Sequence, residues 1–213
     1  MVGTPHNGYF PWQYLLSMNL TWKLLGNKYD IGVALTESCY VHANRNNIMK
    51  EVSKQNCDYL LFIDSDMAWN PDDVERLVEH DLDVVSGLYY TRRPYDGNTP
   101  APVVYRLQHD QTKLKPIYII PDRPFKCDAV GAGFLLLKKR VVDKVMELIP
   151  QIGYPFDFID HEEMGLLPKE NTRFVGEDIS FCHRLKKANF DIWCDPAVRV
   201  GHIRTEILCP ITQ

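Results

Sequence analysis

The sequence predicts an α/β fold in which a mainly parallel central sheet is flanked by helices and followed by a smaller antiparallel part. Three observations support this. Strand-like and helix-like segments alternate as far as Tyr90, a pattern typical of parallel sheets. The segment Asp58–Ile63 is apolar after its first residue, as expected of a strand buried on both faces. Beyond Tyr90 the chain becomes richer in strand-like segments and turn residues.

The first half of the chain divides into short elements. The predicted strands are 1–5, 31–35, 58–64 and 83–90, and the predicted helices are 11–25, 44–55 and one that begins at Asn70. The first helix has an apolar stripe at helical spacing, which we expect to face the core: Trp12, Leu15, Leu16, Leu20 and Leu24. At Asn70-Pro71-Asp72-Asp73, an Asn cap, a Pro and two acids form a strong helix start.

The second half is predicted to be less regular. We expect a loop over 91–102, strands over 102–107, 115–120 and 130–137, and a helix over 139–149. The stretch 150–175 has the length and composition of a functional loop. A last helix over 176–189 and short strands over 191–194 and 198–203 complete the chain.

Bulk composition limits the possible functions. The 213 residues suffice for one sizeable domain, and we assign 1–213 to a single catalytic domain, which can belong to a longer protein. The net charge of -4 gives no basic surface for nucleic acid. An anionic substrate would therefore need local positive charge or a metal ion.

The cysteines and the apolar segments indicate the cellular compartment that we expect for this chain. The six cysteines form no Cys-x-x-Cys pair, and the chain shows no signal peptide, so we expect reduced thiols in the cytoplasm. No apolar run approaches the ~20 residues that a membrane span requires. Peripheral attachment to a membrane stays open.

Two carboxylates follow the apolar strand, in Ile63-Asp64-Ser65-Asp66-Met67. Residues i and i+2 of a strand share a face, so both side chains can point into one site at the strand end, where ligands of α/β sheets bind. A hard divalent cation takes one or two such carboxylates together with substrate phosphates. An isolated Asp-x-Asp is also common in solvated loops, so the motif needs support from elsewhere in the chain.

That support comes from four further motifs in order: Asn44-Arg45-Asn46, Val130-Gly131-Ala132-Gly133-Phe134, Gly176-Glu177-Asp178 followed by Arg184, and Val200-Gly201-His202. With the Asp-x-Asp motif, this series resembles the GT-A-fold glycosyltransferases, whose central sheet is Rossmann-like. The likeness runs from about Gly3 to His202 and is nearest to the large inverting family that includes many polysaccharide and glycolipid synthases. It implies transfer from a nucleotide-sugar, with a UDP-sugar expected, to a glycan or other hydroxyl acceptor.

The resemblance also implies a metal site. Asp64 would contact the donor ribose or the outer shell of a cation, together with its neighbour Ser65. Asp66 and His202 would be ligands of that cation, which bridges the donor diphosphate. Because imidazole suits Mn²⁺ better than Mg²⁺, we expect manganese, with magnesium as the alternative.

Other residues are assigned to the donor by the same resemblance. Gly3, Thr4 and Pro5 would hold the nucleobase, and Arg45 would face the base, ribose or pyrophosphate. Gly131, Ala132 and Gly133 would let the backbone pass close to the donor sugar or metal. Arg92 and Arg93 could clamp phosphate, although a solvated pair of loop arginines explains them equally well.

The same resemblance implies a catalytic acid pair at the last helix. Asp178 would take the proton of the acceptor hydroxyl, while Glu177 would orient the acceptor. The alternative is simple capping, since acids at a helix N-terminus gain ~0.3–1 kcal/mol from the helix dipole.

Competing functions are disfavoured by particular residues. A sugar-phosphate nucleotidyltransferase would carry Arg and Lys in the loop after the first strand, where this chain has only His6. A phosphatase of the haloacid-dehalogenase type would have its Asp-x-Asp near the chain start, followed by other residues than Met67-Ala68. A retaining enzyme of the same fold and a catalytically silent sugar-nucleotide or glycan-binding module stay open.

Overall fold

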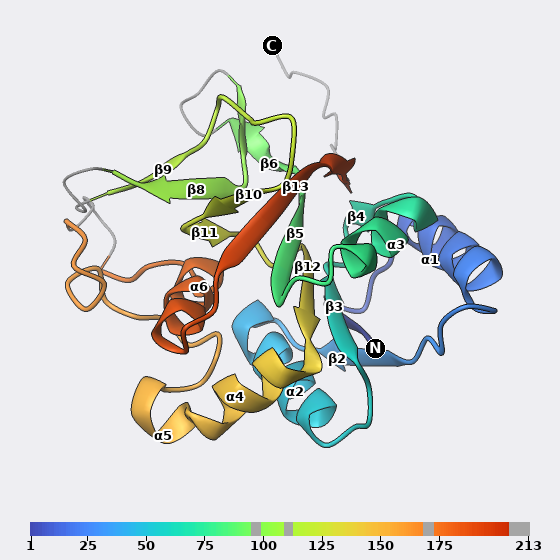
Figure 1. The fold of residues 1–213 in the computed structure, drawn as a ribbon, viewed down its shortest axis with the longest axis horizontal. Coiled ribbons are helices and arrows are strands. Elements are labelled where there is room, and N and C mark those ends of the chain that lie inside the picture. Colours follow the sequence, from blue (N-terminus) through green and yellow to red (C-terminus); the bar gives the residue numbers. More distant parts are fainter. Residues whose placement is uncertain (95–98, 109–112, 168–172, 205–213) are drawn as a thin grey trace, which may run out of the picture.

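The computed structural model describes residues 1–94, 99–108, 113–167 and 173–204 (Figure 1). The helices are α1 Trp12–Leu25, α2 Val41–Ser53, α3 Pro71–Glu79, α4 Lys139–Glu147, α5 Ile149–Ile152 and α6 Glu177–Lys187. The strands are β1 Val2–His6, β2 Val33–Glu37, β3 Tyr59–Ile63, β4 Met67–Ala68, β5 Val84–Leu88, β6 Tyr90–Pro94, β7 Pro100–Pro102, β8 Val104–Leu107, β9 Leu114–Pro116, β10 Phe125–Cys127, β11 Ala129–Val130, β12 Phe134–Lys138, β13 Ile192–Arg199 and β14 Gly201–His202.

The central sheet has seven strands in the order β10-β13-β5-β12-β3-β1-β2. Strands β1, β2, β3, β5 and β13 run in one direction, whereas β12 and β10 run against it. This confirms the predicted α/β class with a mainly parallel sheet. The antiparallel β12 lies inside the sheet, between β3 and β5, rather than in an appended part.

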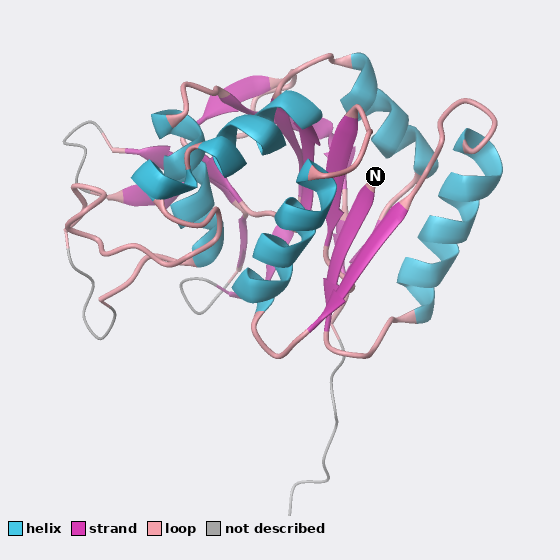
Figure 2. Cartoon of the chain, turned by 90° about the horizontal axis from the view of Figure 1, so that it is seen from below, coloured by secondary structure: helices cyan, strands magenta, loops and turns pink. Residues whose placement is uncertain are grey.

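Helices cover both faces of the sheet (Figure 2). Residues Leu60 and Phe62 of β3 pack in the apolar core under α2, α4 and α6. Their neighbours Leu61 and Ile63 belong to the core under α1 and α3. Successive side chains of a strand point to opposite faces, so a strand between two helical layers must be apolar at every position. The prediction for β3 is confirmed.

The first helix lies with the opposite face inward from the one predicted. The stripe of Trp12, Leu15, Leu16, Leu20 and Leu24 was expected in the core, but Trp12 is 68% exposed and Leu24 is 58% exposed. The buried residues of α1 are Tyr14, Ser17, Met18, Thr21 and Leu25. Both groups of residues recur at helical spacing. The buried group is the one whose hydroxyl side chains form hydrogen bonds with residues outside the helix.

Small sheets complete the fold beyond Tyr90. The stretch 91–102, predicted as a loop, contains the paired strands β6 and β7, and residues 95–98 lie outside the described part. Strands β11, β8 and β9 form a second antiparallel sheet, and β14 pairs with β4. Strand β10 was not predicted. Within the described residues, no helix is long and apolar enough to cross a membrane.

Candidate active site

A cavity of about 1030 Å³ opens where several sheet strands have their carboxyl ends. Residues that follow β1 and β3 line it, together with the start of α2, the start of α6 and the chain around β6 and β14. The residues considered below are Pro5, His6, Asn7, Asn44, Arg45, Asp64, Ser65, Asp66, Tyr89, Arg92, Glu177, Asp178 and His202. A pocket of this size matches those that hold cofactor-sized ligands.

One half of the cavity is organised around Arg45, which is 2% exposed. Its Nη2 donates to both carboxylate oxygens of Asp64, at 2.8 and 2.9 Å. Its Nη1 donates to Asp178 at 2.5 Å and to Glu177 at 3.3 Å. The guanidinium carbon also lies 5.5 Å from the ring centroid of Phe156. We call Arg45, Asp64, Glu177 and Asp178 the Arg45 cluster.

The Arg45 cluster changes the protonation of its members. Burial raises the pKa of Asp178 to about 7, although Arg45 acts to lower it, and the nearby carboxylates of Glu177 and Asp64 raise it further. Burial alone would lower the pKa of Arg45, but the attraction of the carboxylates raises it above its ordinary value. A carboxyl group with a pKa near neutrality is suited to accept a proton in catalysis.

The other half of the cavity contains Asp66 and His202. His202 Nε2 lies 3.5 Å from Asp66 Oδ2, and Arg92 Nη1 lies 3.0 Å from the same oxygen. Burial lowers the pKa of His202, but the hydrogen bonds to Asp66 and to the carbonyl of Tyr90, with the charge of Asp66, outweigh it and raise this pKa. Burial acts to raise the pKa of Asp66, but His202 and Arg92 hold it below its usual value.

A short strand pair brings these two residues together. His202 is the register partner of Met67 in the β14–β4 pair, and the Ile203 amide donates to the Asp66 carbonyl at 2.7 Å. A Cβ built on Gly201 would meet its nearest neighbour, the Ala68 carbonyl oxygen, at 3.5 Å, which is ordinary contact. Space beside the Gly201 Cα would therefore admit a side chain.

The two acids of Asp64-Ser65-Asp66 do not share a strand face. Strand β3 ends at Ile63, and a turn follows in which the Met67 amide donates to the Asp64 carbonyl at 3.1 Å. The turn directs Asp64 to Arg45 and Asp66 to His202. In the described residues there is no group of three or more His, Cys, Asp and Glu side chains that could hold a metal, so Asp64 does not join the other two predicted ligands.

The glycine-containing motifs have packing roles. A Cβ on Gly3 would lie 2.6 Å from Ile48 Cγ2, and one on Gly131 would lie 1.9 Å from the Tyr89 hydroxyl. Of the predicted nucleobase residues Gly3, Thr4 and Pro5, only Pro5 lines the cavity.

The backbone around Gly131, Ala132 and Gly133 lies outside the cavity lining. A Cβ on Gly133 would lie 2.4 Å from Met67 Cε, and the Gly133 amide donates to the Tyr89 hydroxyl at 3.0 Å. The Ala132 backbone hydrogen-bonds Asp178. These residues therefore support Asp178 and Tyr89 rather than line the space for a donor.

Sequence reasoning missed several cavity residues. Tyr89, His6 and Asn7 line the cavity, and no motif pointed to them. Asn44 also lines it and belongs to the motif Asn44-Arg45-Asn46, but no role was predicted for it. The positions of the strand ends could have indicated His6 and Asn7, because His6 ends β1 and Asn7 follows it, as Asp64 follows β3. Arg92 reaches Asp66 as an ion-pair partner, whereas the side chain of Arg93 lies outside the described part.

The unsatisfied polar atoms are also informative. Among the described residues, the buried Asn44 Oδ1 and Arg45 Nε have no hydrogen-bond partner, and both residues line the cavity. Buried polar atoms are rarely left without a partner. Two such atoms in residues that line one cavity indicate that this cavity binds a ligand.

A mixed α/β sheet with acids after β3 and at the start of α6 is the arrangement that the resemblance to GT-A-fold glycosyltransferases predicted. The sequence model of "Glycosyl transferase family 2" matches residues 33–145. The chain therefore belongs to glycosyl transferase family 2 and is an enzyme. No curated protein sequence matches it significantly.

Two solved structures show the same fold. The crystal structure of A197 from STIV has 15% sequence identity and a TM-score of 0.55, covering 100% of this chain and 97% of that chain. A crystal structure of GalNAc-T7 with UDP, GalNAc and Mn²⁺ has 11% identity and a TM-score of 0.55. The latter match covers 95% of this chain but 42% of GalNAc-T7, so it concerns the fold of one part of that protein.

Proposed function

We propose that this enzyme transfers a sugar from a UDP-sugar to a hydroxyl of a glycan or other acceptor, with a divalent cation and with inversion. The observation that carries the proposal is the division of one cavity into two sites. Asp66 and His202, whose side chains are of the types that bind divalent cations, pair on one side, and Asp178, a carboxyl group with a raised pKa, lies on the other. The GalNAc-T7 structure, with UDP and Mn²⁺, supports the choice of nucleotide and cation.

The pair fits a divalent cation. His202 Nδ1 lies 2.8 Å from the carbonyl oxygen of Tyr90, which can only accept, so Nδ1 carries the hydrogen. In neutral His202 the lone pair is then on Nε2, beside Asp66 Oδ2. Metal-binding histidines commonly donate their other N–H to a carbonyl in this way. One imidazole and one carboxylate suit Mn²⁺, with Mg²⁺ as the alternative, and phosphate oxygens of the donor would supply further ligands.

A bound cation would neutralise the charge that develops on the departing nucleoside diphosphate. Arg92 is 55% exposed and reaches the same oxygen of Asp66, so its guanidinium can turn to a diphosphate without leaving a buried position. Pro5, His6 and Asn7 line the cavity at the carboxyl end of β1 and would face the nucleoside. The exposed part of the Asp64 carboxylate would contact the ribose, while the hydrogen bonds from Arg45 fix the position of that carboxylate.

Asp178 would accept the proton of the attacking hydroxyl. It begins α6 beside Glu177 and is bonded to Arg45, not to the Asp66–His202 pair. An inverting displacement needs the base on the acceptor side, away from the leaving group. With its pKa raised to about 7, Asp178 is partly ionised at neutral pH and can take up a proton. Glu177 lines the cavity next to it and would orient the acceptor.

Calorimetry of UDP binding with Mn²⁺ and with EDTA tests the metal site. We expect UDP to bind more tightly with Mn²⁺, and Asp66→Ala to remove that difference. Asp83→Ala is the matched control, because Asp83 forms an exposed ion pair with Arg140 far from the cavity. Equal UDP affinity with Mn²⁺ and with EDTA would contradict the metal site.

Turnover and product analysis test the reaction. Hydrolysis or transfer of a UDP-sugar that depends on Mn²⁺ supports catalysis, and binding without any turnover would identify a silent binding module. The anomeric configuration of the product decides stereochemistry. A product with retained configuration would overturn the role of Asp178 as base in an inverting displacement.

A further inference from the structure

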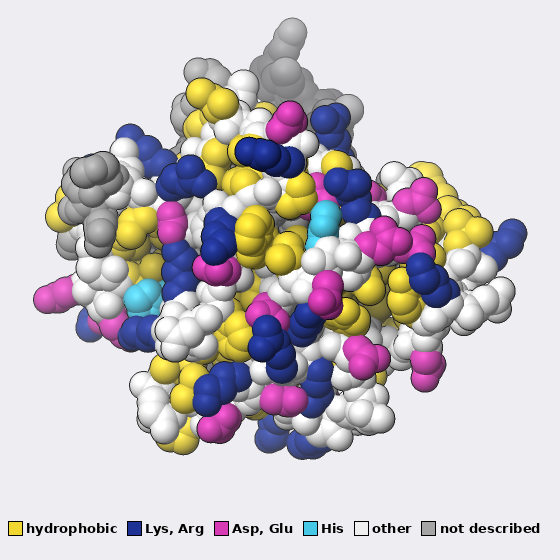
Figure 3. All heavy atoms as spheres, viewed as in Figure 1, with side chains coloured by type: hydrophobic (Ala, Val, Ile, Leu, Met, Phe, Trp, Pro, Cys, Tyr) yellow, Lys and Arg dark blue, Asp and Glu magenta, His cyan; other side chains and the backbone are white. Residues whose placement is uncertain are grey.

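The outward face of α1 is apolar. Five large apolar side chains on this one helix are exposed: Trp12 by 68%, Leu15 by 54%, Leu16 by 49%, Trp22 by 46% and Leu24 by 58%. Hydrophobic side chains gather at the edge of the molecule where Figure 1 places α1 (Figure 3). Contiguous exposed apolar surface on a folded protein commonly marks an interaction site.

The inward face of α1 explains why the apolar residues point outward. The Ser17 hydroxyl accepts from the Trp69 amide at 3.0 Å, and the Trp69 indole donates to the Thr21 hydroxyl at 3.0 Å. The Thr4 and Tyr14 hydroxyls are bonded at 2.6 Å. Turning the helix to bury its leucines would break all three bonds and leave buried polar groups unpaired, which is costly. The exposed apolar face is therefore imposed by the fold.

The charges around this face identify what covers it. Residues 7–29 contain no Asp or Glu, in a chain that has 28 of them. At 100° per residue, Lys23 projects from the middle of the exposed face, close to the direction of Trp12 and Leu16. If α1 of a second copy covered the face, Lys23 would be buried against a helix that has no carboxylate, and an unpaired buried charge is strongly disfavoured.

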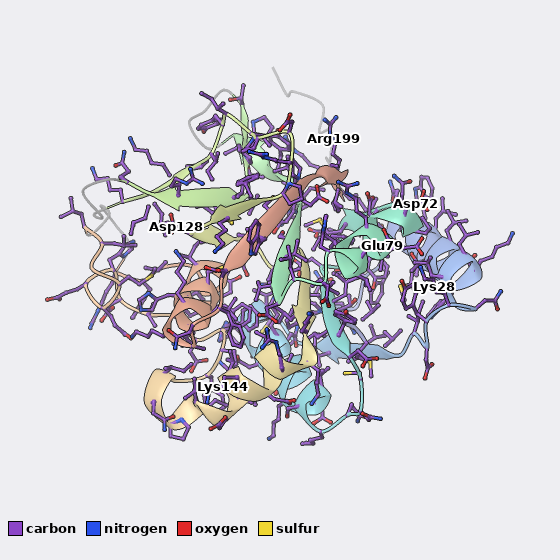
Figure 4. All side chains as sticks on the ribbon, viewed as in Figure 1. Lys28, Asp72, Glu79, Asp128, Lys144 and Arg199 are labelled. Atoms are coloured by element: carbon purple, nitrogen blue, oxygen red, sulfur yellow. The ribbon has the colours of Figure 1, made fainter. Side chains whose placement is uncertain are left out.

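A lipid surface can accommodate both the apolar side chains and the lysine of this face. Lysine can extend its charged end to a lipid phosphate while its methylenes lie along apolar groups. Tryptophan prefers the membrane–water interface, and Trp12 and Trp22 lie near the two ends of the helix. Lys28, which follows α1, pairs with Glu75 of α3. Figure 4 shows Asp72 and Glu79 on neighbouring α3, whose carboxylates do not favour contact with anionic lipid.

We propose that α1 docks in the plane of a membrane surface that contains anionic phospholipids, with its five exposed apolar side chains in the boundary between headgroups and acyl chains. Lys23 contacts lipid phosphate. This interaction is independent of the proposed function, because binding to lipid requires neither nucleotide nor turnover. The buried face of α1 stays packed on Trp69, so the helix lies on the membrane without crossing it.

Co-sedimentation of the full chain with phosphatidylcholine vesicles, with and without phosphatidylserine, tests the proposal. We expect binding to the phosphatidylserine vesicles and a loss of about tenfold or more in affinity for Leu16→Glu, because one apolar side chain no longer enters the lipid. Ile119→Glu is the matched control: Ile119 is 92% exposed and lies in a loop outside α1. Lys23→Glu should also weaken binding, whereas Lys144→Glu on α4 should not.

Three outcomes would overturn the proposal. One is equal vesicle binding by the parent chain, Leu16→Glu and Ile119→Glu. Another is equal binding to vesicles with and without phosphatidylserine. The third is a dimer without vesicles that Leu16→Glu converts to a monomer, which would assign the face to a second copy. Far-UV circular dichroism of each variant confirms folding, and unchanged UDP affinity separates this result from the proposed function.

Discussion

The two halves of the cavity differ in how their charges are held. In the Arg45 cluster, a guanidinium that is 2% exposed bonds to three carboxylates from β3 and α6. In the other half, Arg92 is 55% exposed and reaches a single oxygen of Asp66, which it shares with His202. A buried ion pair resists the loss of one partner, whereas an exposed pair exchanges at little cost.

The difference assigns separate tasks to the two halves. The Arg45 cluster sets the position and the pKa of Asp178 before any substrate arrives. The Asp66–His202 pair has charges that a cation and a diphosphate can replace. A site that must hold a base firmly and release a nucleotide repeatedly benefits from this division. The following predictions test the comparison, starting with the largest expected effect.

Asp178→Asn should lower turnover by about 10²–10⁴-fold, the usual contribution of a positioned base. UDP affinity should change little, because Asn keeps the shape and the metal pair is untouched. Steady-state kinetics together with calorimetry separate the two quantities. Glu163→Gln is the control, since Glu163 is exposed beside Lys187 and does not line the cavity. Weaker donor binding with unchanged turnover at saturation would make Asp178 a binding residue.

Arg45→Met should lower the free energy of unfolding by about 3–5 kcal/mol at neutral pH, because three carboxylates then lose their shared cation. Arg45→Lys should lower the free energy of unfolding by a smaller amount, because lysine keeps the positive charge. Urea unfolding measures both. The matched control is Arg140→Met: Arg140 pairs with Asp83 at the surface, where such pairs contribute up to about 1 kcal/mol. If Arg45→Met lowers the free energy of unfolding no more than Arg140→Met does, Arg45 does not stabilise the three carboxylates of the Arg45 cluster.

The rate should rise as the pH increases through about 7, because Asp178 must lose its proton to act as a base. Glu177 raises the pKa of Asp178, so Glu177→Gln should shift this acid limb of kcat/KM to lower pH. Glu163→Gln, at an exposed position beside Lys187, is the control. An unshifted limb, or one shifted to higher pH, would mean that a different group controls the profile.

Arg92→Gln should raise the affinity for Mn²⁺ without nucleotide by about two- to fivefold, because an exposed ion pair contributes ~0.2–1 kcal/mol. The gain should shrink as salt is added, since exposed charges are screened. Titration followed by electron paramagnetic resonance measures free Mn²⁺. Arg173→Gln, which breaks an exposed pair with Asp160, serves as the control. Lower Mn²⁺ affinity in Arg92→Gln would show that Arg92 supports the metal site instead of competing with it.

The sequence by itself determined the elements whose signals are local. Strand β3 follows from its continuous apolar run, and α3 begins where Asn70, Pro71 and Asp73 predicted it. The Asp73 carboxylate accepts the Asn70 amide there at 2.9 Å. The helix predicted over 44–55 is also present as α2, with Ile48 and Val52 fully buried. Caps and apolar spacing act within a few residues, so they can be read without knowing the rest of the fold.

Only the tertiary structure decided which face of α1 is buried and which partners the charged residues take. Apolar spacing selected the leucine face of α1, whereas bonds to Trp69 from Ser17 and Thr21 fixed the other face inward. Arg45 meets Asp178 across 133 positions, and His202 meets the Tyr90 carbonyl across 112. Such contacts form because strand and helix ends that are distant in sequence converge at one edge of the sheet. The order of residues along the chain does not reveal which charged side chains pair at that edge.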